Sequence, residues 1–124
     1  MKVVFDTNFL ISMVNFHISI DDVLDIFNEN VEPVLLKASI TELEKLIKDG
    51  KYSERKSAKL ALSIVKAKKL KVIGPEKGYV DDLLLELNPK EDVIATQDSG
   101  LKRALKKKGF RLVVIRQKKY AKVE

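Results

Sequence analysis

Residues 1–11, MKVVFDTNFLI, place a polar interruption inside an apolar stretch. Val3–Phe5 is a short apolar run of the kind that forms a strand covered on both faces. Asp6, Thr7 and Asn8 then supply a carboxylate, a hydroxyl and an amide before apolar residues resume. A buried strand that passes at once into a helix start is the beginning of a βα unit. The polar residues at the junction are therefore either a helix cap or part of a site.

The same pattern recurs along the chain. Four more apolar runs suit buried strands: Pro33–Leu36, Leu70–Ile73, Val93–Thr96 and Leu112–Ile115. Segments with helical spacing or helix-start signals fall between them, at residues 8–14, 20–27, 39–49, 58–70, 81–88 and 101–105. Strands that alternate with helices predict an α/β fold, with a central, mainly parallel, five-stranded sheet between two helical layers. Residues 1–124 are expected to form a single domain, with 116–124 as a basic polar tail.

Composition and charge narrow the class of protein. The 124 residues include no cysteine, which excludes disulfides and zinc–thiolate sites. No apolar run approaches the roughly 20 residues of a membrane span, so a cytoplasmic protein without a membrane partner is expected. The net charge of +6 is uneven: residues 1–50 carry −5, from four lysines and nine acids, and residues 51–124 carry +11, from twenty basic residues and nine acids. A basic surface attracts polyanions such as nucleic acid, although a solvated lysine-rich face is the ordinary alternative.

Acidic residues stand beside the expected strand ends and helix starts. Asp6 follows the first strand, Glu42 falls early in the helix after the second strand, and Asp98 comes two residues after the fourth. Asp81 and Asp82 open another helix. Sites in open α/β sheets form outside the carboxyl ends of the strands, so these acids are expected to converge at one edge.

Helix capping is the ordinary alternative for each acid taken alone. Asp6, Asp81 and Asp98 suit N-caps. The run from Ser39 to Glu42, SITE, has the form of a capping box, in which the glutamate reaches back to the serine amide. Capping does not require convergence, however, and neighbouring carboxylates repel one another unless cations neutralise them. Oxygen ligands without cysteine or paired histidine favour Mg²⁺ or Mn²⁺, and a hard-metal site beside a basic surface suits phosphodiester chemistry.

Four motifs together resemble the PIN domain, a family of metal-dependent nucleases with a small three-layer α/β/α fold. FDTNFLI (5–11) is similar to the family's first motif and SITELEKL (39–46) to its second. KGYVDDLLL (77–85) is similar to the third, and VIATQDSGLKRALKKKG (93–109) to the fourth. The last three are especially similar to the PIN endonucleases of ribosomal small-subunit processing and their archaeal relatives. Single-domain PIN toxins are the other near group.

The resemblance implies a site and a reaction. It carries the family's catalytic, metal-binding acids onto Asp6, Glu42, Asp81 and Asp98. Asp82 is a substitute for Asp81, and Asn8 and Thr96 assist by positioning ligands or water. The implied protein is a Mg²⁺- or Mn²⁺-dependent endoribonuclease that hydrolyses RNA with a metal-activated water, in rRNA processing or as a toxin. Many relatives place another acid where this chain has Gly100, so one metal site is expected to be weak.

The last predicted helix is the expected RNA-binding surface. Its four candidate contacts to phosphates are Lys102, Arg103, Lys106 and Lys107. RNA is thus the first expected partner, and the resemblance adds an antitoxin or a ribosome-biogenesis factor. Because PIN domains often pair, it also implies a homodimer.

Two other α/β classes with acidic Mg²⁺ sites fit less well. A receiver domain requires a phospho-accepting aspartate after its third strand, where this chain has Ile73, Gly74 and Pro75. A haloacid-dehalogenase-type phosphatase requires Asp-x-Asp after the first strand, where Asn8 replaces the second acid. The alternative that stays open is a catalytically weak or inactive PIN-fold module that binds RNA or the ribosome, because a sequence shows ligands and not turnover.

Overall fold

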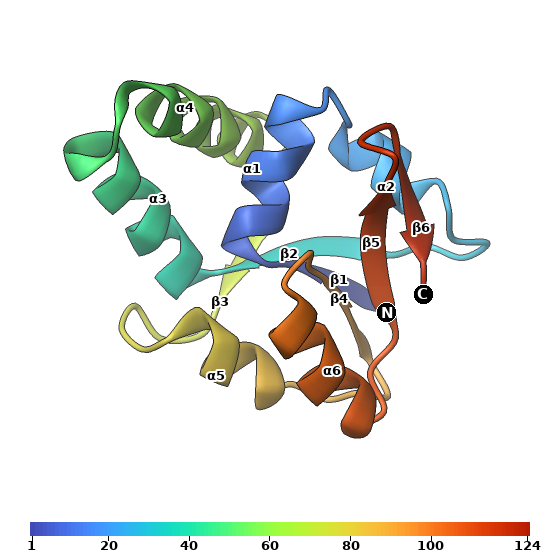
Figure 1. Ribbon diagram of the computed structural model, residues 1–124. Coiled ribbons are helices and arrows are strands. Elements are labelled where there is room, and N and C mark those ends of the chain that lie inside the picture. Colours follow the sequence, from blue (N-terminus) through green and yellow to red (C-terminus); the bar gives the residue numbers. More distant parts are fainter.

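In a computed structural model that describes residues 1–124, a six-stranded sheet lies between two layers of helices (Figure 1). The strands are β1 (Lys2–Phe5), β2 (Glu32–Leu36), β3 (Lys71–Ile73), β4 (Asp92–Ala95), β5 (Leu112–Arg116) and β6 (Tyr120–Val123). The helices are α1 (Thr7–Asn15), α2 (Ile20–Leu24), α3 (Lys37–Asp49), α4 (Tyr52–Ala67), α5 (Val80–Leu85) and α6 (Ser99–Lys107). The predicted α/β fold with a mainly parallel central sheet is confirmed. None of these helices has the length and apolar character that a bilayer crossing demands.

The order of strands creates a crevice at the centre of the sheet. The order is β3-β2-β1-β4-β5-β6, with β6 antiparallel to β5 and all other pairs parallel. In the register, Phe5 at the end of β1 lies between Leu35 of β2 and Ala95 of β4. The chain builds β2 and β3 on one side of β1 and then returns to build β4 and β5 on the other. The carboxyl ends of β1 and β4 therefore form a topological switch point, where open α/β sheets bind ligands.

Two apolar cores hold β1 from both faces. Val3 and Phe5 belong to the larger core, which the sheet shares with α1–α4. Val4 belongs to the smaller core, which includes residues of α5 and α6. These two helices cover one face of the sheet (Figure 1). This alternation follows from the two-residue period of a strand, and burial on both faces explains why β1 reads as an unbroken apolar run. A strand packed on both sides gives the residue that follows it a fixed position.

β6 corrects the expectation of a five-stranded sheet. It lies in the segment expected to be a polar tail, where Arg116 pairs with Tyr120 across a tight hairpin. Gln117 and Lys118 at the turn have φ of 54° and 55°. Such turns usually carry glycine or Asn-Gly at these positions, and the absence of both explains why the hairpin was not predicted.

The predicted start of α3 is wrong by two residues. The helix begins at Lys37, directly after β2, and not after a cap at Ser39. The alternative of a capping box between Ser39 and Glu42 is therefore wrong: Ser39 is buried inside the first turn, and its Oγ has no hydrogen-bond partner. Glu42 is consequently free to point out of the second turn of α3.

Candidate active site

An open cavity of about 410 Å³ lies at the carboxyl edge of the sheet, at the switch point. The residues that line it are Asp6, Asn8, Glu42, Tyr79, Val80, Asp81 and Asp82. They come from the end of β1, from α1, from α3 and from the start of α5, segments that are far apart in the sequence. The structure thus brings three of the four predicted acids to one cavity, together with the predicted Asp82 and Asn8.

Asp6 is held in place by its backbone and by its side chain. Its N–H donates to the Ala95 carbonyl at 2.9 Å, and Thr96 Oγ1 donates to Asp6 Oδ2 at 2.9 Å. Asp6 occupies the N-cap position of α1, but its carboxylate accepts no capping hydrogen bond, so the capping alternative is wrong here. Burial of this 4 % exposed residue raises its pKa from 3.8 to about 6, and the charges of Asp81 and Glu42 add to the rise. The Thr96 hydrogen bond opposes that rise.

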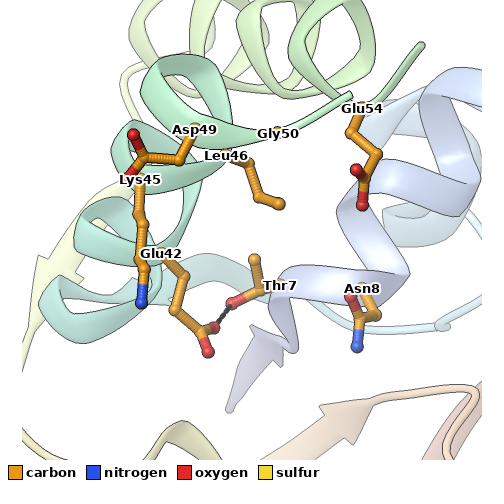
Figure 2. Close-up of a pocket in the computed structure, with 8 residues that line it drawn as sticks. All are labelled: Thr7, Asn8, Glu42, Lys45, Leu46, Asp49, Gly50 and Glu54. Carbon is orange, nitrogen blue, oxygen red and sulfur yellow. Dashed lines mark hydrogen bonds between the residues drawn. The ribbon is translucent and has the colours of Figure 1, made fainter. Parts of the chain in front are cut away.

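Glu42 is oriented by a hydroxyl from another helix. Thr7 Oγ1, at the first position of α1, donates to Glu42 Oε1 at 2.5 Å (Figure 2). Thr7 is itself buried and follows Asp6 directly in the sequence. The first motif therefore supplies one acid and also positions the acid of the second motif.

A second open cavity of about 450 Å³ adjoins the first, because Asn8 and Glu42 line both. It lies between α1, α3 and the start of α4 (Figure 2). Its remaining lining residues are Thr7, Lys45, Leu46, Asp49, Gly50 and Glu54. Lys45 is the one basic residue in the lining of these two cavities. The negative charge therefore extends beyond the predicted acids, into a region for which the sequence predicted no site.

Asp98 lies beside the first cavity and does not line it. Its Oδ1 accepts a hydrogen bond from the Leu101 N–H at 2.6 Å, so capping of α6 is confirmed for this residue. Its own N–H donates to Thr96 Oγ1 at 3.2 Å. The pKa of Asp81 is raised by burial and then by the neighbouring charges of Asp98 and Asp82. Asp98 is therefore close enough to the acids of the cavity to act on them electrostatically.

The donor atoms suit a hard divalent cation. The acids and Asn8 offer oxygen ligands. Burial raises the pKa values of Asp6 and Asp81, and the charges of neighbouring acids add to both rises. As they are arranged, no three acidic or histidine side chains stand close enough together to hold one ion. Mg²⁺ keeps several waters and usually binds one or two carboxylates plus substrate phosphates, so the site fits it without a three-carboxylate cage.

The predicted RNA-binding helix, α6, begins beside the site and runs away from it (Figure 1). Arg103 and Lys107 are exposed, and Lys102 is half-buried. Lys106 Nζ pairs with Glu124 Oε1 at 2.6 Å, and this contact lowers the pKa of the glutamate. One of the four predicted cations is therefore partly neutralised within the chain.

Sequence reasoning missed Lys45, and it missed Tyr79, which lines the first cavity with 82 % of its surface exposed. The signal for Tyr79 was present, because an aromatic residue stands between Gly78 and the acid-bearing start of α5. Lys45 had no such signal among the many lysines of the chain.

A mainly parallel sheet with carboxylates gathered at its switch point defines an α/β domain with an acidic cavity at that edge. The chain belongs to the PIN-like domain family, whose sequence model, described as "PIN like domain", matches residues 3–118. The resemblance predicted from the four motifs is thereby confirmed.

Known relatives agree with this assignment. The chain is 31% identical to "Ribonuclease VapC4" of Methanocaldococcus jannaschii over 122 residues. The aligned region covers 96% of this chain and 93% of that protein. The fold of this chain is similar to that of the PIN domain endonuclease Utp24, with a TM-score of 0.80 and 24% identity. The match covers 99% of this chain and 90% of the Utp24 chain. A domain of a functionally unknown protein from M. jannaschii gives a TM-score of 0.64 at 17% identity, with 93% and 91% covered. Both structural matches show the fold.

Proposed function

We propose that the chain is a ribonuclease that uses Mg²⁺ or Mn²⁺ to hydrolyse phosphodiester bonds in single-stranded or loop RNA. The observation that carries the proposal is the convergence of Asp6, Glu42 and Asp81 on one cavity, with Asp98 beside it. The name of the VapC4 relative, a ribonuclease, supports the same reaction.

The chain's own residues would hold the cation and orient the substrate. When bound, such a cation polarises the scissile phosphate and lowers the pKa of an attacking water. Asp6, fixed by Thr96, and Glu42, fixed by Thr7, present carboxylates with defined orientations. Asp81 and the neighbouring acids face them from the start of α5. Attack by water, and not by the ribose 2′-hydroxyl, leaves 5′-phosphate and 3′-hydroxyl ends.

The biological setting is a finer part of the proposal. We infer RNA as the partner, with cations of α6 holding phosphates that flank the cut. Both a toxin-type role with an antitoxin and a role in rRNA processing are compatible with this site. We also infer a cytoplasmic location, and we infer a homodimer because PIN domains often pair.

One observation favours a second candidate, a PIN-fold module that binds RNA with weak or no catalysis. Gly100 stands where many PIN-domain relatives have an acid, so the site has one carboxylate fewer than theirs. Such a module would still bind RNA through its basic surface.

Cleavage of a short unstructured RNA in Mg²⁺ or Mn²⁺ separates these candidates. We expect cleavage that stops in excess EDTA and in the Asp6→Asn variant, and that persists in a control variant at the exposed Asp25. Binding of RNA without cleavage by the unmodified chain would support the second candidate. Cleavage that continues in EDTA would overturn the metal-dependent mechanism.

A further inference from the structure

We propose that the ring of Tyr79 is a stacking platform for one unpaired nucleobase beside the acid-lined cavity. The ligand would be RNA with an accessible base, and the platform would select single-stranded over duplex RNA. The inference rests on the proposed function, because it takes RNA as the substrate.

The exposure of Tyr79 is the first observation. The residue lines the cavity and is 82 % exposed, the most exposed of the large apolar and aromatic side chains. Its hydroxyl makes no hydrogen bond, and its ring stacks on no other aromatic residue. The other two tyrosines, Tyr52 in α4 and Tyr120 in β6, do not line this cavity. An unpacked aromatic face in the wall of a site is available to a flat ligand.

The backbone that carries the ring is well fixed. The Tyr79 carbonyl accepts the Leu83 N–H at 3.0 Å, which ties it to the first turn of α5. Gly78, with φ of 126°, turns the chain immediately before it. The loop is also attached to α3, because Thr41 Oγ1 donates to the Glu76 carbonyl at 3.4 Å. The backbone of Tyr79 thus has a defined place in the wall of the cavity that Glu42 also lines, and its ring is left unpacked.

The charge of the cavity explains why a base contact is needed there. Its lining contains four acids and no basic residue, so apart from a bound cation it offers no group that attracts the phosphates of RNA. Stacking engages the neutral face of a base, and every base has such a face, so the contact tolerates different sequences. A base inside a duplex reaches the ring only after unstacking and unpairing, which costs free energy. The cavity therefore favours nucleotides that are already unpaired.

The test is binding of a short unstructured RNA in which 2-aminopurine replaces one base at a time. Asp98→Asn is the background, because asparagine also caps helices and the RNA is expected to stay intact. At one position of the RNA, stacking of 2-aminopurine on the Tyr79 ring should quench the fluorescence of the probe. Tyr79→Ala should abolish that quenching and weaken binding by about five- to one-hundred-fold. Tyr79→Phe should retain both, and Tyr52→Ala, at a comparably exposed tyrosine, should change neither.

The salt dependence distinguishes stacking from charge. Because Tyr79 is neutral, its replacement should leave the slope of log affinity against log salt unchanged. Unchanged quenching and affinity in Tyr79→Ala, or equal affinity for single-stranded and duplex RNA, would overturn the proposal. RNA cleavage by the unmodified chain is a separate readout. If no cleavage occurs while quenching still depends on Tyr79, the proposed nuclease function is wrong and the proposed stacking platform is supported.

Discussion

Replacement of Asp6 by asparagine should stabilise the fold at neutral pH. Asp6 is 4 % exposed, and burial with neighbouring charges raises its pKa from 3.8 to about 6. Asparagine is similar in size and keeps an oxygen that accepts the Thr96 hydrogen bond, but it removes the charge. The variant therefore isolates the free-energy cost of an ionised Asp6.

The magnitude follows from the difference between the folded and unfolded pKa values. Between pH 3.8 and about 6, Asp6 keeps a proton in the folded state that it has released in the unfolded chain. The free energy of unfolding therefore falls as pH rises through this range. The stability that protonated Asp6 contributes is fully present below pH 3.8 and is lost as pH rises through about 6. About two pKa units, at 1.36 kcal/mol each, give a loss of roughly 3 kcal/mol. That is a large part of the ~5–15 kcal/mol that stabilises a typical domain.

Urea unfolding followed by circular dichroism in EDTA, from about pH 4 to about pH 8, measures this cost. The Asp6→Asn variant should become more stable than the unmodified chain as pH rises, by roughly 3 kcal/mol near neutrality. The Asp25→Asn control should track the unmodified chain throughout. A stability difference that does not change with pH, or a variant that is less stable at neutral pH, would refute the reasoning.

Three further predictions concern the orientation of Glu42, the basic residues of α6 and the N-cap of α6. Thr7→Val should lower the rate of RNA cleavage by about 10- to 100-fold, because Glu42 loses the hydroxyl that orients it, while RNA affinity measured by filter binding should not change. Neutralising Lys102 and Lys107 to glutamine should flatten the salt dependence of RNA binding by about 0.7 in slope for each, and an unchanged slope would place the RNA elsewhere. Asp98→Ala should lower the free energy of unfolding by about 1 kcal/mol through loss of the α6 cap, whereas Asp98→Asn should keep that stability and still impair cleavage.

The sequence predicts those parts of the fold that local pattern determines. The five short apolar runs and the helical segments between them were sufficient to predict the parallel α/β architecture, because strands buried on both faces leave a clear signature. The hairpin to β6 was not predicted, because Gln117 and Lys118 adopt positive φ without the residues that usually mark such a turn. The start of α3 was misplaced because a well-formed capping pattern lay within the first turns of the helix.

The sequence predicted the acids of the candidate site and, through the resemblance, a positioning role for Thr96, but it predicted no role for Thr7. Convergence of the carboxylates followed from the rule that strand ends share one edge. The hydrogen bond from Thr7 to Glu42 and that from Thr96 to Asp6 join residues 35 and 90 positions apart. Side-chain orientation across such distances depends on packing, which no local pattern encodes. For Tyr79 a local signal was present, but its exposure in the cavity wall depends on the folded loop.

Titration of the protein with Mn²⁺ by isothermal calorimetry tests most directly whether the converging acids form a metal site. We expect saturable binding that is lost in Asp6→Asn and in Glu42→Gln and is retained in the Asp25→Asn control. Binding that is absent from the unmodified chain, or that persists in both acid variants, would contradict it.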